Sequence, residues 1–168
     1  MKVNILRLVL IILLLCTFYV IFGFSSQNSK QSGSLSEKIT TIIVEKLNIV
    51  EGKTKQEKEI IINKLERVIR KLAHFSIYTL VGLLLMGFTS TYKLENIKKV
   101  MISLIIGIVY AISDEIHQSF VPGRSPQFTD VMIDTMGVTL GILLIMLAIE
   151  IYHKQNDIKH ENYTKKLE

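Results

Sequence analysis

The chain carries four long apolar stretches, and the segments between them hold most of its charged residues. Each stretch has about the 20 mostly apolar residues that a helix needs to cross the hydrocarbon core of a bilayer. We predict membrane-spanning helices over residues 5–24, 72–90, 100–118 and 131–152. The pattern therefore indicates an integral membrane protein of the all-α class: a four-helix bundle followed by a polar tail over residues 153–168.

The composition agrees with this class. Hydrophobic residues make up 49% of the chain, which is high for a soluble protein. A length of 168 residues favours one domain, so we treat residues 1–168 as a single membrane domain. The single cysteine, Cys16, lies within the first apolar stretch and has no partner in the chain for a disulfide.

The first apolar stretch is also compatible with a signal peptide, because Lys2 and Arg7 lie at its beginning. The apolar run is long for the central region of a signal peptide, and no A-x-A cleavage pattern follows it. We therefore favour a retained membrane anchor.

The only sizeable polar region lies between the first two spans. Its residues 25–36 are rich in Ser, Gln, Asn and Gly and predict a loop, and residues 39–47 have the spacing of a short amphipathic helix. After a break at residues 50–53, Thr54 and Glu57 fit a capping box that begins a helix running straight into the second span. We expect an amphipathic helical segment on the extracytoplasmic side, resting on the membrane surface or on the bundle.

The formal charge of +5 does not require a nucleic-acid partner, because membrane topology explains where the basic residues lie. Lysines occur in the connection at residues 91–99 and in the tail, whereas the connection at residues 119–129 has only Arg124. Cytoplasmic connections carry the excess of Lys and Arg, so we predict that both termini are cytoplasmic. Arg67, Arg70 and Lys71 oppose this assignment, but they belong to a long segment in which the rule is weaker.

Polar side chains gather at three span ends that connectivity places in the same leaflet: the start of the second span, the end of the third and the start of the fourth. Helical spacing aligns them into stripes that continue into small residues, through which helices pack closely in lipid. We therefore predict one shallow polar pocket. Its candidate binding residues are Arg70, Lys71, His74, Tyr78, Asp114, Glu115, His117, Gln118, Arg124, Asp130 and Asp134.

Four motifs lie at the end of the first span and at these three span ends: F-S-S-Q at residues 24–27, R-K-L-A-H-F-x-x-Y at 70–78, S-D-E-I-H-Q-S-F-V-P-G-R at 113–124 and D-V-M-I-D-T-M-G at 130–137. Together they resemble the VanZ-like family, from the first span through the fourth. Asp134 departs from the family, in which Asn is at least as common at this position. The resemblance implies a multi-pass protein of the bacterial cytoplasmic membrane that lowers susceptibility to teicoplanin-type lipophilic glycopeptides.

Three interpretations of the polar cluster remain open. The charges could form an ion-pair network that closes the bundle, because charged groups within a membrane need partners. They could instead bind the anionic headgroup of a membrane lipid or of a lipid-linked cell-wall precursor, for which the planar guanidinium of Arg124 is suited. A membrane-embedded enzyme acting on a lipid-linked substrate is the third, with His74, Glu115 and His117 as catalytic candidates.

We expect no metal and no cofactor. The chain lacks H-E-x-x-H, and the two histidines in the spans come from different helices, so the sequence signal for a metal is weak. A structural or partner-binding role, with residues 25–70 as the interaction surface, is a further alternative. The sequence does not determine an oligomeric state.

Overall fold

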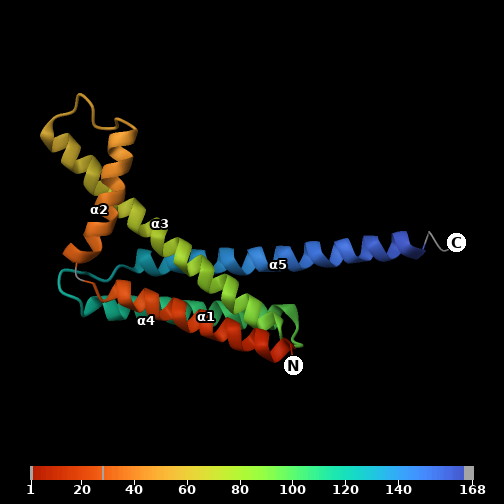
Figure 1. Ribbon diagram of the computed structural model, residues 1–168. Helices are drawn as coiled ribbons and strands as arrows, with labels where there is room; N and C mark the ends of the chain where they lie inside the picture. Colours follow the sequence, from red (N-terminus) through yellow and green to blue (C-terminus); the bar gives the residue numbers. More distant parts are fainter. Residues whose placement is uncertain (1, 28, 165–168) are drawn as a thin grey trace.

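The computed structural model describes residues 2–27 and 29–164, and five helices account for most of them (Figure 1). They are α1 (Lys2–Ser25), α2 (Ser29–Lys46), α3 (Lys55–Ser90), α4 (Asn96–Ser119) and α5 (Phe128–Thr164). The described residues contain no strand, which confirms the all-α prediction. Helices α1, α3, α4 and α5 are long and apolar enough to cross a membrane, as predicted.

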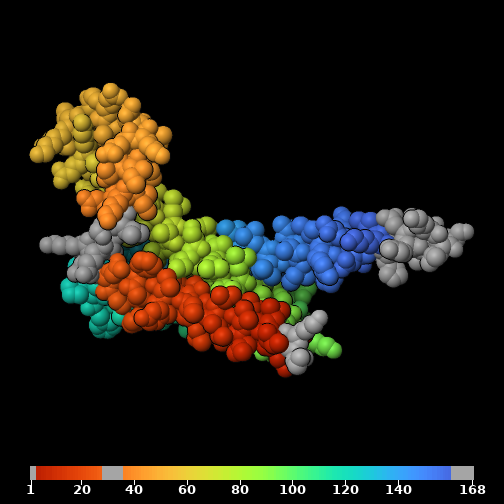
Figure 2. Space-filling view, viewed as in Figure 1, coloured from red at the N-terminus to blue at the C-terminus, as the bar shows by residue number. Residues whose placement is uncertain are grey.

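Helix α1 lies along α3 and α4, with most of its apolar side chains facing outward (Figure 2). Only a narrow strip of α1 is buried, and this strip includes Ile21 and Ser25. Phe18 stacks on Tyr110 of α4 with ring centroids 3.8 Å apart, and the Tyr110 hydroxyl donates a hydrogen bond to the Phe18 carbonyl. An apolar outer surface of this kind suits a helix whose solvent is lipid.

The polar region between the first two spans forms a helical hairpin, made of α2 and residues 55–71 of α3, that stands away from the bundle in Figure 1. The expected loop at residues 25–36 was wrong, because α2 already begins at Ser29. The break at residues 50–53 is confirmed, since Gly52 adopts a left-handed φ of 73° there. The capping box is confirmed as well: Thr54 Oγ1 accepts from the Glu57 N–H, and the Thr54 N–H donates to the Glu57 carboxylate.

Helices α3 and α5 approach each other at backbone distance through glycines. A Cβ atom on Gly82 would overlap the backbone of Val138, and one on Gly141 would overlap the Thr79 carbonyl. A glycine is required at such positions because any side chain would force the helices apart. The core continues from this contact through Tyr78, Val81, Leu85, Ala111, Val138 and Ile142.

The two ends of the bundle differ. At one end, the Arg7 guanidinium donates to the Thr91 hydroxyl and carbonyl and lies 3.9 Å from the centre of the Tyr92 ring. Helix α5 projects beyond the bundle on this side and stays helical to Thr164, through most of the stretch expected as a polar tail (Figure 1). The hairpin and the α4–α5 connection lie at the other end, where the polar residues gather.

Candidate functional site: an arginine-lined cavity at one end of the bundle

A cavity of about 200 Å³ opens at the hairpin end of the bundle, between α3, the α4–α5 connection and the first turns of α5. Its lining is mostly polar and charged. The lining residues are Arg67, Arg70, Lys71, His74, Gln118, Gly123, Arg124, Ser125, Gln127, Asp130, Ile133 and Asp134. The three span ends that the sequence assigned to one leaflet therefore do meet around one cavity.

Arg70 and Arg124 supply much of the positive charge at this cavity. Neither forms an ion pair with a carboxylate among the described residues, and each has a buried Nε–H group without an acceptor there. Burial, together with the nearby Arg70 guanidinium, lowers the pKa of Arg124, against the opposing effect of Asp114 and Glu115. A guanidinium stays protonated in proteins, so the cavity holds positive charge that is only partly neutralised.

The α4–α5 connection holds Arg124 against the bundle. Gly123 takes a left-handed φ of 80°, and the Arg124 N–H donates to the Val121 carbonyl in the same turn. Arg124 Nη1 then donates to the side-chain oxygen of Gln118 at 2.8 Å, and Nη2 donates to the Phe24 carbonyl at the end of α1. The guanidinium is thus fixed by two other helices while its Nε–H remains available.

Gln118 is the centre of this network and is nearly completely buried. Its amide nitrogen donates to Asp114 at 3.0 Å and to the Ser25 hydroxyl at 3.4 Å, while its oxygen accepts from Arg124. Gln118 lies one helical turn after Asp114, which places both side chains on one face of α4. A single amide therefore links α1, α4 and the connection that carries Arg124.

Lys71 and Asp130 form an ion pair across the mouth of the cavity, with Nζ and Oδ1 separated by 2.8 Å. Both side chains are more than a third exposed, so solvent screens the attraction and the pair adds little stability. Its main consequence is for charge: Lys71 is neutralised by a protein carboxylate, in contrast to Arg70 and Arg124.

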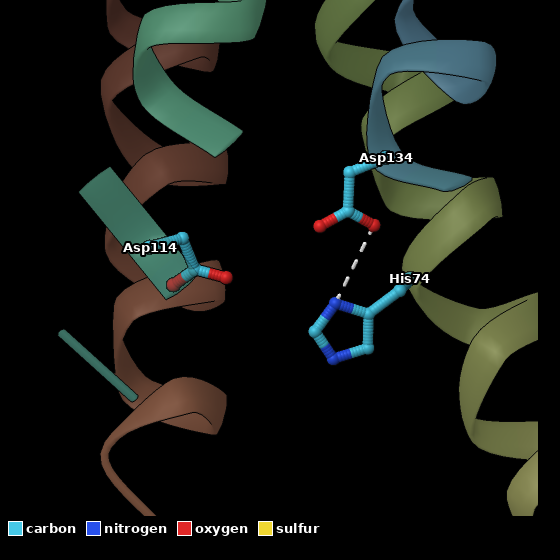
Figure 3. A group of neighbouring side chains, drawn as sticks. All are labelled: His74, Asp114 and Asp134. Atoms are coloured by element: carbon cyan, nitrogen blue, oxygen red, sulfur yellow. Dashed lines mark ion pairs between the residues drawn. The ribbon is translucent and has the colours of Figure 1, made fainter. Parts of the chain in front are cut away.

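Three side chains from three helices converge beside the cavity (Figure 3): His74 of α3 and Asp134 of α5, which line it, and Asp114 of α4, which does not. Their ligand-type atoms all lie within 4.8 Å of one another. His74 Nδ1 and Asp134 Oδ1 are 3.7 Å apart, which is too far for a hydrogen bond. Tyr78 is fully buried one turn beyond His74, and its hydroxyl has no hydrogen-bond partner among the described residues.

Glu115 and His117, two of the three catalytic candidates, do not line the cavity. The Glu115 carboxylate accepts a hydrogen bond from the Gln127 N–H and faces a separate apolar groove between α4 and α5. The His117 ring stacks on Phe22 with centroids 4.4 Å apart, and its Nε2 contacts the Ser26 hydroxyl at 3.0 Å. Glu115 therefore attaches the α4–α5 connection to α4, and His117 attaches α1 to α4. Of the three catalytic candidates, His74 is the one that lines the cavity.

The cavity also includes residues that the sequence analysis did not select, namely Arg67, Gly123, Ser125, Gln127 and Ile133. The spacing of Arg67 could have identified it, because it lies one turn before Arg70 and Lys71 and two turns before His74. Gly123, Ser125 and Gln127 could not have been identified by helical spacing, because they lie in the α4–α5 connection and their positions depend on how the chain turns after α4.

The fold and the cavity define a multi-pass helical membrane protein with a polar, arginine-lined site at one end of its bundle. The model of the VanZ/LLP1 family matches residues 10–149, and the chain belongs to that family. Searches of curated proteins and of solved structures found no match.

Proposed function

We propose that the cavity binds the anionic headgroup of a membrane lipid or of a lipid-linked cell-wall precursor, and that this binding lowers susceptibility to teicoplanin-type glycopeptides. The observation that carries the proposal is the pair of buried Nε–H groups, on Arg70 and Arg124, that lack an acceptor among the described residues. A buried donor without a partner costs free energy, and a ligand oxygen in the cavity would remove that cost.

The chemistry of the lining favours phosphate over a neutral headgroup. Guanidinium groups present planar donors that match phosphate oxygens, and charge-assisted hydrogen bonds are stronger than neutral ones. Arg67, Arg70 and Arg124 form no ion pair with a carboxylate in the described part of the chain, and all three line the cavity. A doubly anionic group, such as a phosphate monoester or a diphosphate, would balance this charge best.

The cellular setting of the proposal follows from family membership and from the distribution of lysines. Membership of the VanZ/LLP1 family is consistent with a teicoplanin-resistance type of envelope protein. The lysines at residues 91–99 and beyond residue 152 favour a cytoplasmic location for that end of the bundle. The cavity would then open at the outer leaflet of the bacterial cytoplasmic membrane, where lipid-linked wall precursors are used.

Arg70→Gln and Arg124→Gln test the proposal. Each removes hydrogen bonds from a charged donor, worth about 1.5–3 kcal/mol, so affinity for phosphatidic acid, a lipid with a phosphate monoester headgroup, should fall about 10- to 100-fold in nanodiscs. In cells, both variants should return teicoplanin susceptibility to the level of cells without the protein. Native mass spectrometry of the co-purified lipid distinguishes a bulk phospholipid from a lipid-linked precursor.

Lys98→Gln is the matched control, because it removes one cation at the opposite end of the bundle, where Lys98 pairs with Glu95 at 3.0 Å. This variant should keep full lipid binding and full resistance. If Arg70→Gln and Arg124→Gln insert normally and also keep both properties, the cavity is not the functional site.

An enzyme acting on a lipid-linked substrate is the second candidate, because His74 and Asp134 line the same cavity as the arginines. An imidazole beside a carboxylate can transfer protons to a substrate bound next to it. Turnover of a lipid-linked substrate by the purified protein would favour this candidate, provided that it is lost in His74→Ala and kept in His117→Ala. Binding without turnover favours the first proposal.

A further inference from the structure

His74, Asp114 and Asp134 have the composition and spacing of a metal site. One imidazole nitrogen and two carboxylate oxygens lie within 4.8 Å of one another, each from a different helix. Figure 3 shows Asp114 on one side, facing His74 and Asp134 on the other. Ligands of a tetrahedral zinc ion lie about 2.0–2.2 Å from the metal, which separates them from each other by roughly 3.4 Å. The 3.7 Å between His74 Nδ1 and Asp134 Oδ1 is close to that separation.

Two buried polar atoms, one in this trio and one beside it, have no hydrogen-bond partner among the described residues. Asp134 is only 2% exposed, and its Oδ1 atom has no hydrogen-bond donor among the described residues. The hydroxyl of the fully buried Tyr78 likewise has no partner at hydrogen-bond distance among the described residues. A buried carboxylate oxygen needs a hydrogen-bond donor or a cation. Without one, its burial in a low-dielectric environment costs on the order of several kcal/mol.

The protein cations near the trio do not meet this requirement. Lys71 pairs with Asp130, and Arg124 donates to Gln118 and Phe24. Asp114 receives the Gln118 amide, which fixes the orientation of its carboxylate as outer-shell hydrogen bonds do in metal sites. Protonated His74 could partly balance Asp134, but at 3.7 Å it would do so without a hydrogen bond.

We propose that His74, Asp114 and Asp134 bind a divalent transition-metal ion, with Zn²⁺ or Mn²⁺ as the best match. An imidazole ligand favours these ions over Mg²⁺ and Ca²⁺, which prefer oxygen ligands alone. Three protein ligands leave further coordination positions for a water molecule or a ligand oxygen, as in catalytic zinc sites. His74 and Asp134 line the cavity, so the ion would border the space between Arg70 and Arg124 and could share a bound phosphate with them.

The test uses the full chain without a histidine tag, purified in mild detergent, treated with a chelator and then exchanged into Zn²⁺ or Mn²⁺. Mass-spectrometric metal analysis after gel filtration should find one ion per chain. The Co²⁺-loaded protein should show the visible absorption of a low-symmetry site. Asp134→Asn and His74→Ala should weaken binding by at least about tenfold, since altering even an outer-shell partner costs 10- to 100-fold.

Two matched controls separate a site from general affinity for cations. Glu95→Gln removes a carboxylate at the opposite end of the bundle, where Glu95 pairs with Lys98, and His117→Ala removes a histidine outside the cavity. Both should bind Zn²⁺ as the wild type does. The proposal is overturned if the wild type binds no stoichiometric metal, or if Asp134→Asn binds Zn²⁺ and gives the Co²⁺ spectrum unchanged.

The outcome is separable from that of the proposed function. If lipid binding depends on Arg124 and persists in the chelator-treated protein, the proposed lipid site is supported and the metal has no role in lipid binding. Stoichiometric Zn²⁺ with no effect of Arg124→Gln on lipid binding would retain the metal site and reject the lipid proposal.

Discussion

Gln118 shows how much of the site depends on one uncharged side chain. Its amide joins Asp114, Ser25 and Arg124, so α4, the end of α1 and the α4–α5 connection share one group. A glutamine can do this because its side chain offers donors and an acceptor together, whereas a carboxylate or an ammonium offers only one kind. The orientation of the Arg124 guanidinium therefore depends on Gln118 of α4 together with the Phe24 carbonyl of α1.

Gln118→Leu should destabilise the protein and weaken the site. The change leaves the Asp114 carboxylate without the amide donor and Arg124 Nη1 without its acceptor, which costs about 1–3 kcal/mol. Thermal unfolding in detergent, followed by circular dichroism, should show a lower midpoint, and lipid binding should fall.

Ser113→Ala is the matched control on the same helix. The Ser113 hydroxyl is exposed and donates only to the Tyr110 carbonyl of its own helix, so stability should change by no more than about 0.5 kcal/mol. An equal loss in both variants would mean that the Gln118 network is not what stabilises this end of the bundle.

At the residue scale, helical phase predicted part of the site. The spacing on α3 and α5 placed His74, Asp130 and Asp134 at the cavity, as the structure does. Helical spacing also put His117 on the stripe of Asp114, three residues before it, whereas Glu115 was included because it lies at the same polar span end. Successive helical residues point in different directions, and the structure directs Glu115 toward the α4–α5 groove and His117 toward Phe22 of α1.

Among the elements, α2 differed most from expectation. Of its residues with described side chains, Ser36, Thr40 and Val44 are buried, at intervals of four, while Ile39 and Ile42 are exposed. The buried face of α2 therefore mixes two hydroxyl residues with one apolar residue, unlike the apolar face of a soluble amphipathic helix. A search for an apolar stripe could not recognise the start of this helix. The capping box at Thr54, by contrast, depends only on local residues and was predictable.

The α3–α5 contact should be intolerant of a single added methyl group. Gly82→Ala would place a Cβ atom within the backbone of Val138, and overpacking of this kind costs about 1–3 kcal/mol. We expect a lower thermal midpoint in detergent.

Gly87→Ala provides the comparison on the same helix. Its added Cβ atom would meet only Leu10 Cδ2, at an ordinary contact distance of 3.9 Å, and alanine favours helix over glycine by roughly 0.5–1 kcal/mol. Gly87→Ala should be neutral or stabilising. Equal effects at both positions would contradict the close approach of α3 and α5.

For the whole molecule, connectivity alone predicted that the hairpin and the α4–α5 connection share one end, because each span reverses the direction of the chain. Hydropathy also predicted the number of spans. The stripes of small residues predicted that the second, third and fourth spans face one another, but they did not distinguish the close pairing of α3 with α5 from the other contacts.

Orientation can be measured with single cysteines in a Cys16→Ser background, since Cys16 is the chain's only cysteine. If the cavity opens outside the cell, a membrane-impermeant maleimide should label Ser125→Cys in intact cells. Lys93→Cys, at the opposite end, should react only after lysis. The reverse pattern would place the cavity in the cytoplasm and remove the proposed access to wall precursors.

Helix α3 runs without interruption for 36 residues, or about 54 Å, from the capping box at Thr54 to Ser90. A bilayer core accounts for only about 30 Å of that length. The arm that stands away from the bundle and the cavity wall carrying Arg70 and His74 are consequently parts of one continuous helix. A force applied to the arm would therefore reach that wall through the helix itself, with no joint between them.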